Sequence, residues 1–271
     1  MAFKSLIGMN MKLAANLGYL FTELPLLERF DAAAQAGFKG VELLAPNEHP
    51  TEQMAEVIGN AGVQLIQFNA AMGDWEAGQR GIGVIPGREG EFQDAIGEAL
   101  AFTRALGNQQ LHVMSGVLED HIDPETARSV LINNLKFAAE SCAKEGIKAQ
   151  IEPINTIDMP GYFVSSPKFG LEILKDVGHP NLYLQYDIYH AQISEGYLAE
   201  NIRQHVDAIN HIQIGGVPGR HEPDGGEINY PYLFDVIDEV GYQGWVSCEY
   251  KPYAGTREGL GWAAPYGVTT G

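Results

Sequence analysis

The chain has 271 residues, 45% of them hydrophobic, a length and composition suited to one large α/β domain. Its 17 basic and 35 acidic residues give a formal charge of −18, which argues against nucleic acid and against an anionic membrane as partners. Residues 1–11 hold no sustained apolar run, Cys142 and Cys248 are isolated, and no stretch reaches the ~20 apolar residues of a membrane span, so a cytoplasmic protein without a signal peptide is predicted.

Strand-like and helix-like periodicities alternate along the first half of the chain. The strands are predicted at residues 13–17, 40–44, 63–68 and 110–114, and the helices at residues 24–36, 51–60, 89–106 and 123–144. Gly37 and Gly107 directly follow two of these helices, as C-terminal glycine caps do. The glycine-rich segment 69–88 is predicted to be a loop that forms a lid or rim over a site, the alternative being a merely decorative excursion.

The same alternation continues to the end of the chain. Strands are predicted at residues 147–152, where Pro153 ends the ladder, and at 181–187, 208–214 and 244–250, and helices at residues 167–177, 198–206 and 232–240. Residues 256–271 are predicted to form a final helix that becomes partly disordered. Eight strands with helical segments between them predict a single-domain α/β protein, a (β/α)₈ TIM barrel spanning residues 1–271.

Polar side chains end four successive predicted strands. Glu152, Asp187, Gln213 and Glu249 each share a strand face with other polar residues and are spaced by roughly one β/α unit. Because the carboxyl ends of barrel strands meet at one rim, these four side chains are expected to converge there. Three carboxylates and one amide suit a hard divalent cation, Mg²⁺ or Mn²⁺, better than zinc. The alternative is a buried hydrogen-bonded network without a metal.

Nearly the whole chain resembles a known family, the xylose-isomerase-like TIM-barrel sugar isomerases and ketose 3-epimerases, and within it the hydroxypyruvate isomerase group. Seven motifs carry the resemblance: residues 73–81 (GDWEAGQRG), 85–89 (IPGRE), 151–155 (IEPIN), 186–190 (YDIYH), 211–214 (HIQI), 226–230 (GEINY) and 248–252 (CEYKP). Gln213 stands where the related epimerases usually have histidine, and it agrees with the hydroxypyruvate isomerase pattern.

The resemblance implies an isomerase that interconverts hydroxypyruvate and tartronate semialdehyde through an enediolate. It implies that Glu152 and Glu249 are the acid/base pair and that both are also metal ligands, together with Asp187 and Gln213. A 2-oxo-tetronate isomerase or a ketose 3-epimerase remains the alternative, so the substrate is expected to be a small 2-oxo acid or a short ketose. Relatives are commonly dimers or tetramers, and the sequence leaves a homo-oligomer open.

The remaining expected site residues would bind the substrate. The resemblance places Asp158, His190 and Arg220 in contact with it. A substrate carboxylate needs a cation at the rim, for which Arg220, Lys251 and Arg80 are the candidates. Lys251 has the same strand parity as Glu249 and therefore reaches the same face.

Overall fold

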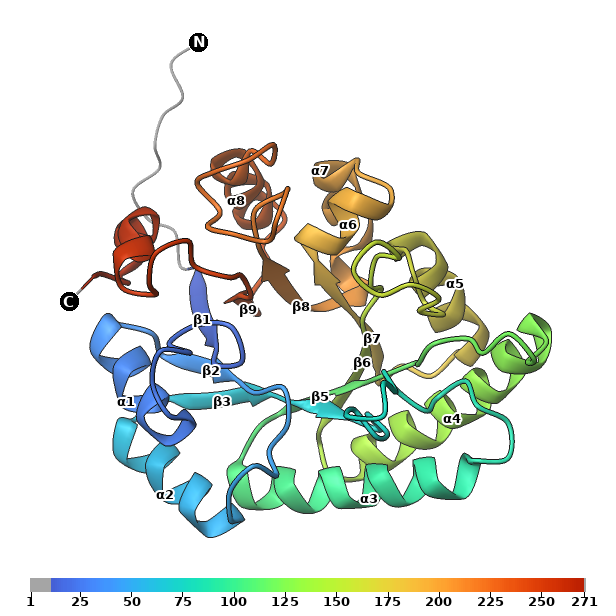
Figure 1. Cartoon of the computed structure of the whole chain (residues 1–271). Helices are drawn as coiled ribbons and strands as arrows, with labels where there is room; N and C mark the ends of the chain where they lie inside the picture. Colours follow the sequence, from blue (N-terminus) through green and yellow to red (C-terminus); the bar gives the residue numbers. More distant parts are fainter. Residues whose placement is uncertain (1–10, 271) are drawn as a thin grey trace.

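The computed structural model describes residues 11–270 and forms the predicted (β/α)₈ barrel (Figure 1). Residues 1–10, where no signal peptide is predicted, and Gly271, at the end of the predicted tail, lie outside the described residues. None of the helices within residues 11–270 combines the length and apolarity that crossing a membrane requires.

All neighbouring strands of the single sheet are parallel, in the order β3-β2-β1-β9-β8-β7-β6-β5-β4. The strands are β1 (Lys12–Asn16), β2 (Gly40–Glu42), β3 (Gln64–Gln67), β4 (Asn69–Ala70), β5 (Gln110–Val113), β6 (Lys148–Ile151), β7 (Leu182–Asp187), β8 (Ile209–Ile214) and β9 (Trp245–Cys248). Because β1 pairs with β9, the first and last strands join the two halves of the barrel.

The strand predicted at residues 63–68 is followed in the structure by a second short strand that the sequence did not predict. β3 pairs with β2 and β4 pairs with β5, and only Phe68 separates β3 from β4. The Phe68 backbone oxygen accepts from His112 N at 3.2 Å, so this residue still bonds toward β5. The prediction that the loop starts at residue 69 was therefore wrong, because Asn69 and Ala70 pair with His112 and Val113.

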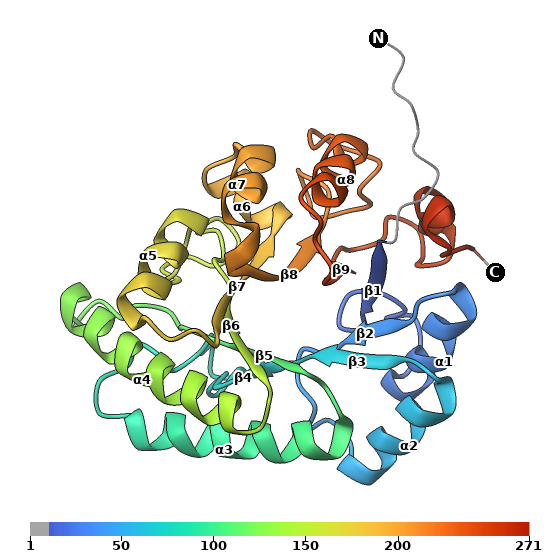
Figure 2. The same cartoon turned by 180° about the vertical axis from the view of Figure 1, so that it is seen from behind.

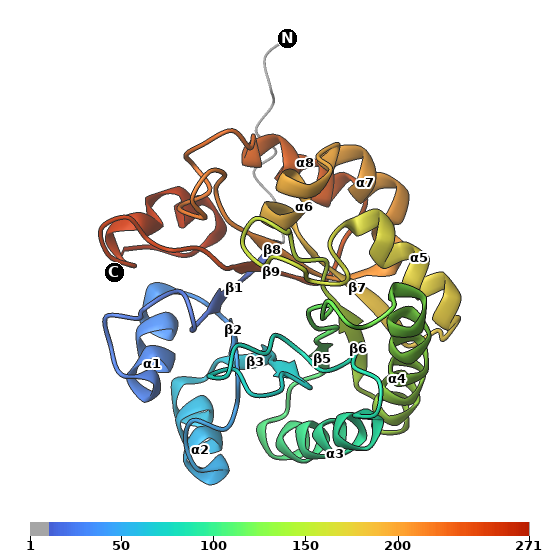
Figure 3. The same ribbon diagram turned by 45° about the vertical axis from the view of Figure 1, so that its right-hand side comes forward.

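Helices surround the strands as an outer ring (Figures 2 and 3). They are α1 (Leu26–Ala36), α2 (Thr51–Ala61), α3 (Glu89–Leu106), α4 (Pro124–Lys144), α5 (Pro167–Val177), α6 (Ile188–Ser194), α7 (Leu198–His205) and α8 (Tyr230–Glu239), with the 3₁₀ helices η1 (Val206–Ala208) and η2 (Glu258–Tyr266). Local chemistry explains the boundaries. Asp123 accepts from Thr126 N at 2.9 Å and Pro124 opens α4, while Gly107 ends α3 with a φ of 80°.

Two element predictions need correction. The strand predicted to end at Glu152 ends one residue earlier, at Ile151, so Glu152 begins the following loop. The sequence interpretation also missed α6, which starts directly after Asp187 and is capped by that residue's side chain. A strand that passes into a helix without a turn leaves no break in the sequence pattern.

The predicted C-terminal segment contains η2, which follows the last strand, β9, and completes the outer ring. Leu260 and Ala263 are fully buried, and the Trp262 ring stacks on Phe234 of α8. On the other side, Thr269 N donates to Ala36 O of α1 at 2.8 Å. This segment therefore fills the gap between α8 and α1.

The barrel interior is polar, whereas the space between strands and helices is apolar. Gln67, Gln150, Gln185 and Gln213 are each at most 2% exposed. Gln150 Nε2 donates to Gln67 Oε1 at 2.5 Å and to Gln185 Oε1 at 2.9 Å. Buried amides are tolerated only when they are hydrogen-bonded, so these side chains form a connected network that leads to one end of the barrel.

Candidate active site

The four side chains predicted to converge do lie together at the carboxyl ends of the strands. Glu152 follows β6, Asp187 ends β7, Gln213 lies in β8 and Glu249 follows β9. All four are buried. A pocket opens above them, and its walls include Glu152, Asp158, His190, Arg220, Glu249 and Lys251. Both predicted catalytic residues and four of the predicted substrate contacts, Asp158, His190, Arg220 and Lys251, thus line this pocket, whereas Arg80 does not.

Two amides connect the paired glutamates. Gln185 Nε2 donates to Glu152 Oε2 at 2.9 Å and to Gln213 Oε1 at 2.7 Å. Gln213 Nε2 then donates to Glu249 Oε2 at 2.5 Å. The second oxygen of Glu152, Oε1, has no hydrogen-bond partner among the described residues. Glu152 is therefore held by one donor, with an unsatisfied oxygen beside the pocket.

Arg220 is the cation at the centre of the site. Its Nη2 donates to Asp187 Oδ2 at 2.6 Å and to Glu249 Oε1 at 2.5 Å, and its Nε donates to Glu249 O at 2.9 Å. The guanidinium lies between the rings of Tyr19 and Tyr189, 4.9 and 4.8 Å from their centroids. These contacts fix its plane, which suits a planar group recognising carboxylates.

The tautomer of His190 follows from its neighbour Asn155. Asn155 Oδ1 accepts from the backbone nitrogens of Ile157 and Asp158 at 3.0 and 2.9 Å, which fixes the amide orientation. Its Nδ2 therefore donates to His190 Nδ1 at 2.6 Å. Burial, and then Arg220, hold the pKa of His190 well below its usual value, so the ring is neutral. Two donors face this neutral ring, Asn155 Nδ2 at Nδ1 and Arg220 Nη1 at 3.2 Å from Nε2. Because a neutral imidazole accepts at only one nitrogen, the shorter Asn155 contact favours acceptance at Nδ1 and the proton on Nε2.

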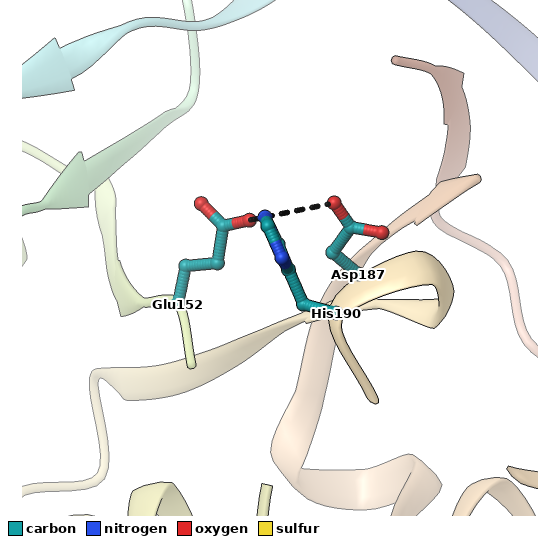
Figure 4. A group of neighbouring side chains, drawn as sticks. All are labelled: Glu152, Asp187 and His190. Carbon is teal, nitrogen blue, oxygen red and sulfur yellow. Dashed lines mark ion pairs between the residues drawn. The ribbon is translucent and has the colours of Figure 1, made fainter. Parts of the chain in front are cut away.

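His190 Nε2 faces the carboxylates, as Figure 4 shows. It lies 3.7 Å from Glu152 Oε1 and 3.6 Å from Asp187 Oδ2. A metal-binding histidine normally donates its other N–H to an acceptor. In this structure the other nitrogen meets an amide donor instead. The ring is therefore better placed to donate to a substrate oxygen than to bind a cation.

The two other predicted substrate contacts lie higher on the pocket wall. Asp158 accepts from Asn155 Nδ2 at 3.2 Å, so one amide organises both Asp158 and His190. Lys251 is exposed, and its backbone nitrogen donates to Arg220 O at 2.6 Å. Its ammonium is thus free to meet a substrate anion at the rim.

Arg80, which was predicted as a candidate cation for the substrate carboxylate, does not line this pocket. Its guanidinium stacks 4.0 Å from the Trp75 ring centroid and donates to Trp75 O at 3.0 Å. Trp75 does line the pocket and is 41% exposed. Arg80 therefore braces the loop that places Trp75 at the pocket mouth.

Burial controls the pKa values of the carboxyl groups. Burial, followed by repulsion from Glu249 and Asp187, holds the pKa of Glu152 well above its usual range. Burial also raises the pKa of Glu249 to about 8, although Arg220 opposes the shift. The pKa of Asp187 is raised by burial as well, again against Arg220. The positive charge of Arg220 therefore does not offset the effect of burial on the pKa values of these three carboxyl groups.

A divalent cation fits this donor set. Three ionised carboxylates facing one guanidinium leave two negative charges, and Glu152 Oε1 lacks a partner. Glu152, Asp187 and His190 each offer an atom within 4.8 Å of the others. The carboxylate oxygens of this group suit a hard divalent cation.

Sequence reasoning did not assign Asn16, Tyr19 and Tyr189 to the site. Tyr189 lies within the YDIYH motif and Asn16 ends β1, so both had a positional signal. After Lys12 every residue of β1 is buried, so β1 has no alternation of buried and exposed residues that would assign Asn16 to the face of the site. Tyr19 follows β1 in a loop and has no strand parity to read.

Comparison with known proteins agrees with this geometry. The sequence profile described as "Xylose isomerase-like TIM barrel" matches residues 30–266. The 2-oxo-tetronate isomerase of Cupriavidus necator is 48% identical over 94% of this chain and 98% of its own length. The hydroxypyruvate isomerase of Escherichia coli is 44% identical over 94% and 99%. A crystal structure described as an AP endonuclease, family 2, from Brucella melitensis superposes with a TM-score of 0.92 at 45% identity, over 94% and 99%.

Proposed function

The chain belongs to the xylose isomerase-like TIM barrel family, and on that premise we propose that this isomerase interconverts hydroxypyruvate and tartronate semialdehyde. The observation that carries the proposal is the pair Glu152 and Glu249, two buried glutamates with raised pKa values at one pocket, joined through Gln185 and Gln213. Raised pKa values keep carboxyl groups able to exchange protons near neutral pH.

The substrate carboxylate is bound by cationic side chains in this proposal. Lys251 offers its ammonium at the rim and Arg220 lies in the pocket wall. His190 Nε2–H donates to a substrate oxygen in this proposal, because the short Asn155 contact at Nδ1 favours the proton on Nε2. Trp75 covers the opening and excludes water from the reacting carbons.

Proton transfer is divided between the two glutamates according to their hydrogen bonds. Glu249 is contacted by Arg220, Asn16 and Gln213, which stabilise its carboxylate, so Glu249 removes the proton from the carbon. Glu152 has only Gln185 as donor and a free Oε1, so it keeps its proton and delivers it. In the enediolate the hydroxyl proton passes to the former carbonyl oxygen, so the net change moves one carbon-bound and one oxygen-bound proton between neighbouring carbons, with no electron lost from the molecule. Glu249 then releases its proton to solvent and Glu152 takes one up, which restores both groups.

A divalent cation, Mg²⁺ or Mn²⁺, would be held by Glu152, Asp187, Gln213 and Glu249, and when bound it would supply positive charge to the substrate's oxygen atoms. Among the chain's own residues, Arg220 supplies positive charge to Asp187 and Glu249. The chain's own residues thus organise the site around anionic oxygens.

A second candidate substrate is 2-oxo-tetronate, which is one carbon longer. The specific observation in its favour is the 48% identity to the Cupriavidus necator enzyme, against 44% to the Escherichia coli hydroxypyruvate isomerase. Both reactions would use the same two glutamates. A ketose 3-epimerase is less well supported, because Gln213 replaces the histidine that is usual in those relatives.

Cleavage of DNA is not supported by this chain, despite the description of the Brucella melitensis structure. A nucleic-acid enzyme binds phosphates through clustered lysine and arginine side chains. With 17 basic and 35 acidic residues, the chain carries the opposite charge balance. A small anionic substrate needs only the local cations Arg220 and Lys251.

The test is a panel of short 2-oxo acids and ketoses assayed with Mg²⁺ and with Mn²⁺. We expect turnover of hydroxypyruvate, and a fall in kcat of at least about 10³-fold in both Glu152→Gln and Glu249→Gln with the fold intact. Glu98→Gln, on the exposed surface of α3, is the matched control and should keep wild-type turnover. Wild-type activity in both site variants would refute the assignment, and turnover of 2-oxo-tetronate alone would favour the longer substrate.

A further inference from the structure

Beneath Glu249 lies a second buried carboxylate, Glu42 of β2, that the proposed chemistry does not use. It is fully buried, and its Oε1 contacts Nε2 of His211, which is fully buried in β8. Since a carboxylate only accepts, His211 Nε2 carries the proton in this contact. A buried carboxylate without a role is expensive, so the position of Glu42 asks for an explanation.

The other oxygen of Glu42 shares its two donors with Glu249. Asn16 Nδ2 donates to Glu42 Oε2 at 3.2 Å and to Glu249 Oε2 at 2.7 Å. Gln213 Nε2 donates to Glu42 Oε2 at 3.0 Å and to Glu249 Oε2 at 2.5 Å. Each NH₂ group has two hydrogens, and each places one on either carboxylate.

Independent contacts fix the direction of both amides. Asn16 Oδ1 accepts from Gly18 N at 2.9 Å, and Gln213 Oε1 accepts from Gln185 Nε2 at 2.7 Å. The same Gln185 nitrogen donates to Glu152. A continuous series of oriented hydrogen bonds therefore runs from His211 through Glu42, Gln213 and Gln185 to both glutamates of the site.

We propose that Glu42 is a positioning residue, which turns the NH₂ groups of Asn16 and Gln213 toward Glu249 and keeps the Gln213 oxygen directed toward Gln185 and the site. Without a carboxylate at position 42, the NH₂ groups of Asn16 and Gln213 each lose one of their two acceptors, so they are held toward Glu249 less firmly. Glu249 would then lose one of its fixed donors.

This inference rests on the proposed function, so its test includes a readout that needs no substrate. Glu42→Gln preserves the side-chain volume but places an NH₂ group, which is a donor, where the neighbours Asn16 and Gln213 also donate. We expect kcat to fall by about 10- to 100-fold with KM within about threefold, and the Mn²⁺ affinity measured by calorimetry to fall by a similar factor. Glu42→Asp restores the charge at a shorter reach and should recover part of both.

The matched control is Asn108→Ala, at the start of β5 and thus at the opposite end of the barrel. It removes one buried hydrogen bond, from Asn108 Nδ2 to Gln110 O at 2.9 Å. It should lower Tm while leaving kcat and Mn²⁺ affinity unchanged. If Glu42→Gln behaves like Asn108→Ala, with a lower Tm but wild-type kcat and Mn²⁺ affinity, Glu42 is merely structural and the proposal is overturned.

Two further comparisons decide the remaining outcomes. If Glu42→Gln does not fold, Glu42→Asp and His211→Gln are compared, and wild-type kcat and Mn²⁺ affinity in both overturn the proposal. If the wild-type chain turns over none of the short 2-oxo acids, the proposed function fails, and the Mn²⁺ affinities alone decide the role of Glu42. A wild-type chain without turnover and without Mn²⁺ binding overturns both.

Discussion

Arg220 holds Glu249 from two sides: its Nη2 contacts the carboxylate at 2.5 Å and its Nε contacts the backbone oxygen of the same residue at 2.9 Å. Nη2 also reaches Asp187 at 2.6 Å. A lysine ammonium has no planar fork and cannot reproduce these three contacts. The position of Glu249 therefore depends on a guanidinium at residue 220.

We predict that Arg220→Lys lowers kcat/KM by about 10²-fold or more, because the fork that aligns Glu249 is lost. Arg220→Met should also lower the free energy of unfolding by about 3–5 kcal/mol, since it leaves buried Asp187 and Glu249 without their cation. Steady-state kinetics and urea unfolding measure the two effects. Arg104→Met, which removes the exposed ion pair with Glu145, is the control and should change stability by less than about 1 kcal/mol. An Arg220→Lys enzyme with unchanged kcat/KM would contradict the prediction.

The Asn155–His190 contact gives a second prediction. Asn155→Asp replaces a donor by an acceptor opposite His190 Nδ1, so the ring proton should move to Nδ1 and leave a lone pair on Nε2. The substrate then loses one hydrogen bond, and we expect KM to rise about tenfold, which corresponds to ~1.4 kcal/mol. Nitrogen NMR of the imidazole identifies the tautomer. An unchanged Nε2–H form in the variant would show that Asn155 does not set it.

Cation binding can be tested without any substrate. Mn²⁺ or Mg²⁺ at about 100 times its dissociation constant should stabilise the protein by about 2.7 kcal/mol, visible as a rise in Tm that EDTA reverses. Asp187→Asn removes one of the buried carboxylates and should abolish most of the rise. Glu239→Gln, an exposed partner of Arg203 on α8, should leave the rise intact. An equal rise in both variants would place the cation elsewhere.

The pH dependence of stability follows from Glu249. Its pKa is raised from 4.5 to about 8 by burial, so between these values the folded state keeps a proton that the unfolded state releases. The free energy of unfolding of the metal-free protein should therefore fall as pH rises from about 5 to 8, by an amount on the order of a few kcal/mol. Glu249→Gln should flatten this slope in urea titrations. A metal-free protein that gains stability over this range would contradict the prediction.

Periodicity and capping residues predicted much of the fold. Residues 89–106 were predicted as a helix and form α3 with the same bounds, because Gly107 adopts a left-handed conformation that ends it. The break at Phe68 was not predictable, since it depends on pairing with two different neighbours, β2 and β5. α6 was missed because Asp187 both ends a strand and caps a helix.

Strand parity placed the carboxylates of the candidate site but not their partners. Glu152, Asp187, Gln213 and Glu249 could be found because each ends, follows or nearly ends a strand. Arg220 lies in a loop, where it has a positive φ of 57°, and a loop arginine gives no sequence signal of burial. Its burial depends on contacts with residues that are distant in the sequence. The Asn155–His190 tautomer depends on an amide orientation that no sequence pattern carries.

The pairing of β1 with β9 has a consequence for synthesis on the ribosome. Asn16 and Glu249, 233 positions apart, meet across this seam through a 2.7 Å hydrogen bond. Translation delivers Asn16 near its beginning and Glu249 near its end, so a nascent chain has no complete pocket until almost all of it has emerged. Proton-transfer chemistry is thereby withheld from every unfinished copy of the polypeptide.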